Sequence, residues 1–137
     1  VQAMNYFRYL GTKSKTDIRS SKEIYNTALS YIAKGNYADS IVLLEIAANE
    51  GHIESIKKLS ESYMLGRGVK ISSEESFKVL LKYKKLKSPE INYLIGLKYE
   101  LGEGVPSSYV KAAKLYEEAT KQNYSKAKTA LEQIRGY

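Results

Sequence analysis

The chain has 137 residues, of which 43% are hydrophobic and 27% charged, a composition that is ordinary for a globular domain and excludes wholesale disorder. It contains no cysteine, which excludes a disulfide scaffold, a thiolate zinc site and a cysteine nucleophile. The 22 Lys and Arg residues exceed the 15 Asp and Glu residues and give a net charge of +7, so acidic partners have to be considered.

The N-terminal segment, residues 1–20, has the weakest pattern in the chain. Residues 3–10 are expected to be a helical remnant of an earlier repeat, and residues 11–21 a polar, basic connector. Because the first residue is Val1 rather than Met, we expect a fragment or a processed product in which any targeting segment is not visible. No apolar run approaches the roughly 18 residues that suggest a membrane-spanning helix.

Residues 21–54 are predicted to form the first helix pair. Ile24, Ala28 and Tyr31 recur at helical spacing, and Gly35 then breaks the pattern. A second apolar series runs to residues 50–52 and includes Ser40, Leu43, Leu44 and Ala47. The turn between the two helices is four residues shorter than the corresponding turns further along the chain.

The next two units repeat each other. Residues 63–69 read Tyr-Met-Leu-Gly-Arg-Gly-Val and residues 99–105 read Tyr-Glu-Leu-Gly-Glu-Gly-Val, which is five identical positions of seven at an offset of 36 residues. Repeats of this length are typical of helical solenoids. We therefore predict two further helix pairs, in residues 55–90 and 91–126, and a capping helix in residues 127–137.

The glycines of the repeated segment are predicted to end the first helix of each pair. Gly66 and Gly102 can adopt the left-handed conformation that a side chain would penalise, and Val69 and Val105 are then expected to enter the core. Serines at 72 or 73 and at 107 or 108 are predicted to cap the second helices, and Ser72 with Glu75 matches a capping box. The second helix of the middle pair is expected to carry Phe77, Leu80, Leu81 and Lys84 on one side.

These residues resemble the Sel1-like repeat (SLR) family of the tetratricopeptide-repeat superfamily. The third unit fits the family pattern best, through Ile95, Gly96, Tyr99, Gly102, Gly104, Val105, Lys111, Ala112, Tyr116, Ala119 and Ala127. The middle unit departs from it, since Ser60 replaces a glycine, and residues 21–54 are similar to the shorter tetratricopeptide form. The resemblance implies an all-α fold, namely a right-handed α-solenoid of antiparallel helix pairs with one tetratricopeptide-like unit, two Sel1-like units and a C-terminal capping helix.

No catalytic, metal or cofactor site is expected. His52, the single histidine, lies at a predicted turn, and the adjacent carboxylates of residues 74–75 and 117–118 point in diverging directions on their helices, whereas acid–base catalysis needs groups that converge. The Gly-x-Gly segments follow helices and lack the third glycine of a dinucleotide-binding loop. We therefore predict a protein that is not an enzyme.

The resemblance implies a concave face lined by the first helix of each pair, and this face is predicted to bind a partner protein or peptide. The partner-binding positions transferred from the superfamily are Tyr25, Leu29, Lys57, Glu61, Met64, Leu65, Tyr93, Leu97, Glu100 and Leu101. The lysine and asparagine clamp that some relatives use for C-terminal carboxylates is not reproduced. An alternative is that several of these side chains form the core between repeats.

The leading hypothesis for function is thus a noncatalytic adaptor or scaffold module. One alternative is a basic module that binds nucleic acid or an anionic membrane surface, because Lys78, Lys82 and Lys85 are predicted to share one helix face. The other alternative is a structural segment of a longer solenoid.

Overall fold

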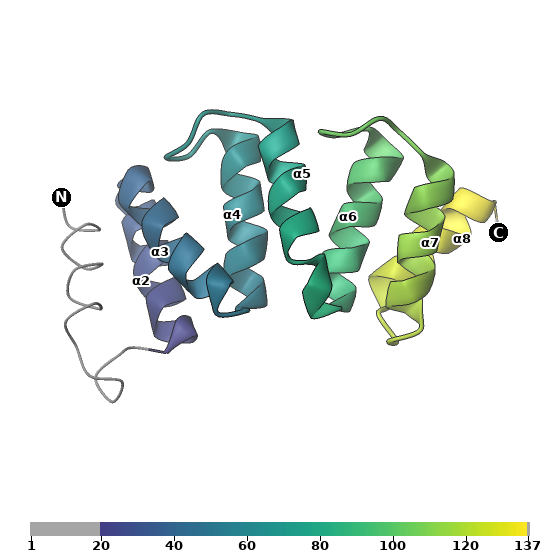
Figure 1. Cartoon of the computed structure of the whole chain (residues 1–137), viewed down its shortest axis with the longest axis horizontal. Helices are drawn as coiled ribbons and strands as arrows, with labels where there is room; N and C mark the ends of the chain where they lie inside the picture. The colour runs from purple at the N-terminus through teal and green to yellow at the C-terminus, as the bar shows by residue number, and fades with distance from the viewer. Residues whose placement is uncertain (1–19, 137) are drawn as a thin grey trace. The chain divides into compact units, whose positions relative to one another are not determined.

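Seven α-helices and one short 3-10 helix make up residues 20–136, which are the residues that the computed structural model describes (Figure 1). No strand occurs in this part of the chain. The expected helical remnant in residues 3–10 lies outside the described residues. The elements are α2 (Ser21–Ala33), α3 (Tyr37–Asn49), α4 (Ile53–Leu65), α5 (Ser73–Lys82), η2 (Lys84–Leu86), α6 (Pro89–Leu101), α7 (Tyr109–Thr120) and α8 (Ser125–Arg135).

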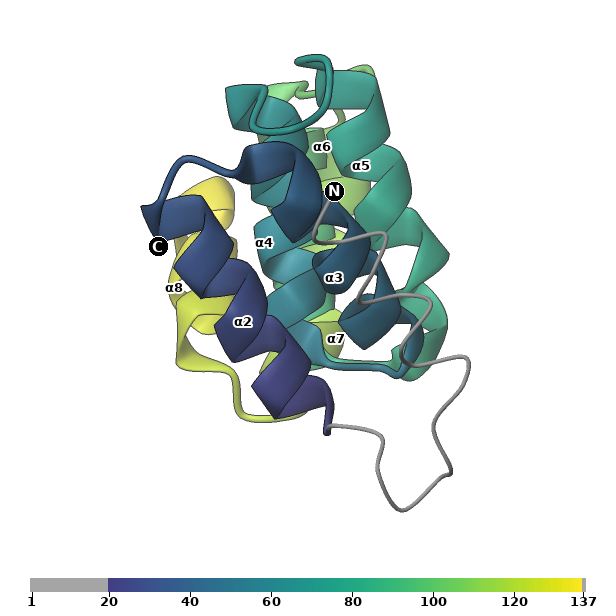
Figure 2. The same ribbon diagram turned by 90° about the vertical axis from the view of Figure 1, so that its left-hand side faces the viewer.

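The chain divides into two compact units, and the division falls after Ile71. The first unit contains α2, α3 and α4, and α3 packs against both of the others (Figures 1 and 2). The second unit contains α5, η2, α6, α7 and α8, and α7 packs against both α6 and α8. The boundary therefore separates α4 from α5, which are the two helices of the predicted middle repeat.

Side-chain caps begin most of the helices. The hydroxyl oxygens of Ser72 and Ser108 accept hydrogen bonds from the backbone N–H groups three residues later, at 3.1 and 3.2 Å, and so cap α5 and α7 as predicted. The reciprocal half of the expected capping box is not formed, because the Glu75 carboxylate pairs with Lys78 at 3.4 Å instead. Ser88 caps α6, where Pro89 occupies the first turn, a position that needs no N–H donor.

Glycines end α4 and α6 in the predicted left-handed conformation, with φ of 69° at Gly66 and 68° at Gly102. The second glycine of each repeated segment has a different role. A Cβ atom on Gly68 would lie 2.4 Å from the carbonyl oxygen of Tyr37, and one on Gly104 would lie 2.1 Å from the carbonyl oxygen of Ser73. Each loop therefore packs its backbone directly against the start of a preceding second helix.

Three sequence expectations need correction. Val69 and Val105 are half-buried rather than part of the core, because the loops that carry them run over the surface. The second helix of the middle pair ends at Lys82, so Lys84 lies in η2. The last helix begins at Ser125 rather than at residue 127.

The core of the second unit is built around a tyrosine. Tyr116 is completely buried and packs with small side chains of α7 and α8, which are Ala112, Ala119, Ala127 and Ala130, and with Leu131. The alanines let α7 and α8 approach each other closely. Gly96 of α6 likewise leaves room for the Tyr116 ring of α7. No helix of residues 20–136 has the length and apolar character needed to cross a bilayer.

Candidate interaction surfaces

The predicted partner-binding residues of α2 lie on its half-buried side. Tyr25 and Leu29 are both half-buried. The Tyr25 ring packs against the imidazole of His52, with ring centroids 5.0 Å apart. His52 also caps α4, since its Nδ1 accepts a hydrogen bond from the Ser55 backbone N–H at 3.2 Å. The single histidine thus has a structural role that the sequence pattern did not reveal, because histidine is not among the usual capping residues.

The predicted residues of α4 combine paired charges with accessible apolar groups. Lys57 pairs with Glu54 at 3.3 Å, and Glu61 pairs with Lys58 at 2.9 Å. Such exposed pairs contribute little to stability. Met64 is half-buried, whereas Leu65 is 51% exposed.

The predicted residues of α6 serve the core as well as the surface. Tyr93 and Leu97 are half-buried and pack against the cluster around Tyr116. The Tyr93 ring has its centroid 5.8 Å from that of Tyr116 and 5.5 Å from that of Tyr124. Aromatic pairs at these separations add to the energy of area burial. Truncation of Tyr93 would therefore affect both stability and any binding.

Glu100 has a partner inside the protein. Its Oε1 accepts a hydrogen bond from the Tyr116 hydroxyl at 2.8 Å. Burial of the phenol is the main cause that raises the pKa of Tyr116 far above its usual value, and the hydrogen bond to the nearby carboxylate adds to it. Tyr116 hence stays a neutral hydrogen-bond donor, which holds Glu100 in place at the end of α6.

A pocket of about 320 Å³ lies in the second unit, lined by Glu100, Tyr109, Gln133 and Ile134. These residues come from the last turn of α6, the start of α7 and the last turn of α8. Tyr109 is 62% exposed, and Leu101, next to Glu100, is 61% exposed. Sequence reasoning missed Tyr109 and Ile134. The available signal was the Tyr-Val pair directly after the Ser108 cap, where a polar first turn is usual.

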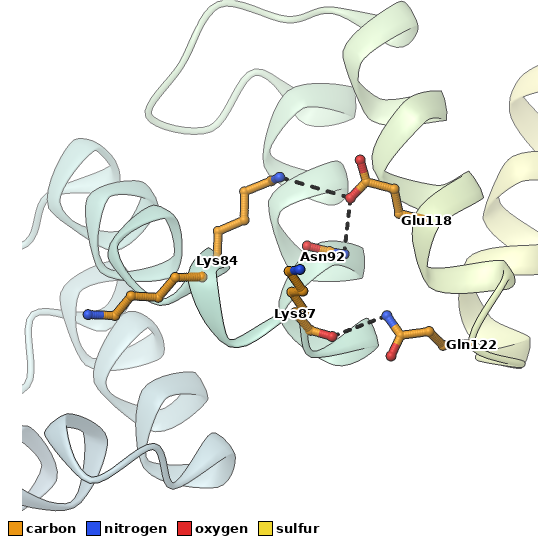
Figure 3. A pocket seen from close by; sticks show the side chains of 6 residues that line it. Lys84, Lys87, Asn92, Glu118 and Gln122 are labelled. Carbon is orange, nitrogen blue, oxygen red and sulfur yellow. Dashed lines mark hydrogen bonds and ion pairs between the residues drawn. The ribbon is translucent and has the colours of Figure 1, made fainter.

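A second pocket, of about 430 Å³, lies where η2 leads into α6 (Figure 3). It is lined by Lys84, Lys85, Lys87, Asn92, Glu118 and Gln122. The Gln122 side-chain amide donates a hydrogen bond to the Lys87 backbone carbonyl at 3.1 Å and so ties the end of α7 to this loop. The lysines of this segment are evident in the sequence, but their spacing does not predict a pocket.

The predicted lysine face is divided between two elements. Lys78 and Lys82 lie on α5, whereas Lys85 lies in η2, because the α-helix ends at Lys82. All three side chains are exposed. They are consequently a basic surface without the single helical register that the sequence indicated.

The adjacent carboxylates of α7 contact different residues of the second unit. Glu117 pairs with Arg135 of α8, while the adjacent Glu118 faces Lys84 and Asn92. Within residues 20–136 no group of three or more His, Asp or Glu side chains could hold a metal ion. The adjacent carboxylates of α7 therefore serve two different structural contacts.

Comparison with solved structures identifies the fold. The chain superimposes on a Sel1 repeat protein from Oxalobacter formigenes with a TM-score of 0.69 and 23% identity, over 80% of this chain and 45% of that one. It also superimposes on a protective antigen of uropathogenic Escherichia coli strains that displays an SLR fold, with a TM-score of 0.69 and 24% identity, over 85% of this chain and 26% of that one. The chain thus spans less than half the length of either protein. The predicted fold class is confirmed.

At the level of sequence alone, the comparisons give no relative. No protein-family model matches the chain, and a search of curated proteins found no match.

Proposed function

From the premise that this chain is a helical-repeat module with the Sel1-like repeat fold, we propose that it is a noncatalytic adaptor that binds a segment of a partner protein. Proteins with stacked helical repeats expose extended surfaces formed by successive helices, and they commonly use these surfaces for recognition. The proposal assigns recognition to the surface of α6 and its neighbours in the second unit, and to Lys57, Glu61, Met64 and Leu65 on α4.

The observation that supports the proposal most is the pocket between α6, α7 and α8. Its lining combines an aromatic ring, Tyr109, with an aliphatic group, Ile134, and two polar side chains. Interfaces commonly have an apolar centre with a polar rim, and a volume of about 320 Å³ lies within the range of about 300–1,000 Å³ of ligand pockets. A partner side chain inserted here would contact Tyr109 directly.

The test begins with capture of the partner from the cells that make the protein, followed by calorimetric titration. Tyr109→Ala should weaken binding by about 1–3 kcal/mol, since aromatic anchors carry a large share of interface energy. Val110→Ala is the matched control, because Val110 is the next residue, is 69% exposed and does not line the pocket. Equal affinities of the wild-type protein and the Tyr109→Ala variant would move the binding site elsewhere.

Tyr93→Ala and Leu97→Ala complete the test of the α6 surface. Tyr93→Ala should also weaken binding by roughly 1–3 kcal/mol, but its ring contacts predict a lower melting temperature as well. Measuring melting temperature and affinity on the same variants separates the two roles. Loss of stability without loss of affinity in the folded fraction would assign both residues to core packing.

A second candidate function, binding to nucleic acid or an anionic membrane, draws on the net charge of +7 and on the exposed lysines of α5. Salt concentration distinguishes the two. Binding to phosphates weakens steeply as salt rises, whereas salt does not screen the contacts of uncharged groups such as Tyr109 and Ile134. Titration of the chain against a duplex oligonucleotide at 50 and 200 mM salt therefore tests this function directly.

A further inference from the structure

The pocket beside η2 contains a buried acceptor that the protein itself leaves unused. The Asn92 side chain is 4% exposed, and its Nδ2 donates to Oε2 of Glu118 at 3.3 Å (Figure 3). A carboxylate can only accept hydrogen bonds, so Glu118 fixes which end of the amide faces it. The opposite atom, Asn92 Oδ1, has no hydrogen-bond partner among the described residues.

An unpaired buried acceptor is unfavourable, because it has lost its hydrogen bonds to water. A bound group with an N–H or O–H donor would remove this cost. The site therefore favours a ligand with a hydrogen-bond donor that can reach Asn92 Oδ1.

The same pocket has an excess of positive charge, so it favours a ligand that carries a negative charge next to its N–H or O–H donor. Three lysines and one carboxylate line it, and the carboxylate, Glu118, is partly neutralised by Lys84 at 3.9 Å. In residues 20–136, neither Lys85 nor Lys87 has a carboxylate within ion-pair distance. Lys87 is also held in a left-handed conformation, with φ of 55°, and its carbonyl is bonded to Gln122.

We propose that this pocket binds an acidic residue of a peptide. A backbone N–H of the peptide donates to Asn92 Oδ1, which requires a small shift of the side chains that cover this buried atom. An adjacent Asp or Glu side chain pairs with Lys85 and Lys87. A phosphomonoester dianion satisfies only the second requirement, because its terminal oxygens accept hydrogen bonds and carry no proton to donate. The proposal rests on the adaptor function in one respect, which is that the ligand is part of a protein, and it adds an acidic-residue subsite distinct from the Tyr109 pocket.

The experiment is a titration of the isotopically labelled full chain, followed by nuclear magnetic resonance. The probe is the blocked peptide N-acetyl-Gly-Glu-Glu-Gly-amide, and its matched control is N-acetyl-Gly-Gln-Gln-Gly-amide. The acidic peptide should shift the side-chain amide signals of Asn92 and the backbone amide of Lys87, while the neutral peptide should bind at least about fivefold more weakly, because hydrogen bonds to charged groups are the stronger ones.

Two variants test the residues. Lys85→Gln combined with Lys87→Asn should weaken the acidic peptide by at least about fivefold; asparagine is chosen because it tolerates the left-handed conformation. Asn92→Leu removes the acceptor in a side chain of similar shape and should also weaken binding. The control pair Lys78→Gln and Lys82→Gln removes the same charge from α5 and should change the affinity by less than about twofold.

Four results would overturn the proposal. They are no shift at Asn92 and Lys87, equal binding of the two peptides, equal weakening by the control pair, and binding of inorganic phosphate at the same site as tightly as the acidic peptide. The titration needs no natural partner, and Tyr109→Ala should leave it unchanged. Failure of this subsite and failure of the adaptor function are therefore distinguishable.

Discussion

Replacement of Gly96 by alanine tests the close contact between α6 and α7 in the second unit. A Cβ atom on Gly96 would lie 2.5 Å from Cε1 and 2.8 Å from Cδ1 of the Tyr116 ring. The ring has little freedom to move away, because Tyr116 is completely buried, its hydroxyl is bonded to Glu100 and its face packs against Tyr93. The added methyl group must therefore displace α6 from α7.

Two effects of opposite sign set the expected magnitude. Overpacking a well-packed core costs about 1–3 kcal/mol, and contacts this short belong in the upper part of that range. Alanine is favoured over glycine within a helix by about 1 kcal/mol. The free energy of unfolding should consequently fall by about 1–2 kcal/mol in Gly96→Ala.

Urea denaturation followed by circular dichroism measures this free energy. The matched background is Tyr116→Leu, since leucine is the residue at the corresponding position of the preceding repeat, Leu80. In the Tyr116→Leu background the ring is absent, so Gly96→Ala should leave the free energy of unfolding unchanged or raise it. An unchanged or higher stability of Gly96→Ala alone, or the same loss in both backgrounds, would refute the steric explanation.

Three further predictions concern single contacts. Gly104 and Gly35 both have positive φ, but only at Gly104 would an added Cβ atom collide with the backbone, since nothing lies within 4 Å of a Cβ on Gly35. Gly104→Ala should therefore lower the free energy of unfolding by more than about 2 kcal/mol, whereas Gly35→Ala should lower it only by the roughly 1–2 kcal/mol of a left-handed side chain. Equal melting temperatures of the two variants would contradict this. His52→Ala should lose about 1 kcal/mol with the α4 cap, and His52→Asn should largely retain it, as judged by thermal melting. Since the pKa of Tyr116 is raised in the folded state, the unfolded chain loses this proton first, and stability should fall as pH rises above about 10. Tyr116→Phe should show a shallower alkaline loss of stability, and identical pH profiles would show that Tyr116 does not contribute.

The sequence alone determined the helical repeats because the signals that define them are local. Apolar spacing sets the buried side of each helix, a serine oxygen caps the N–H groups of its own helix, and Gly66 and Gly102 are the residues that tolerate a left-handed turn without penalty. The repeated Gly-x-Gly-Val segment placed these turns at the right positions. The family resemblance then added the pairing of helices, which matches the fold of the solved structures.

The tertiary structure alone decided how individual side chains are used, because their partners lie far away in sequence. Glu100 is expected on a binding surface, but it accepts a hydrogen bond from the Tyr116 hydroxyl. Tyr93 is expected on the same surface, but its ring packs against the buried ring of Tyr116. Helical period assigns a residue to a face, but it does not distinguish a face that meets solvent from one that meets another helix. The second pocket shows the same limit, since Asn92 and Glu118 are 26 residues apart and meet only because α6 and α7 pack together.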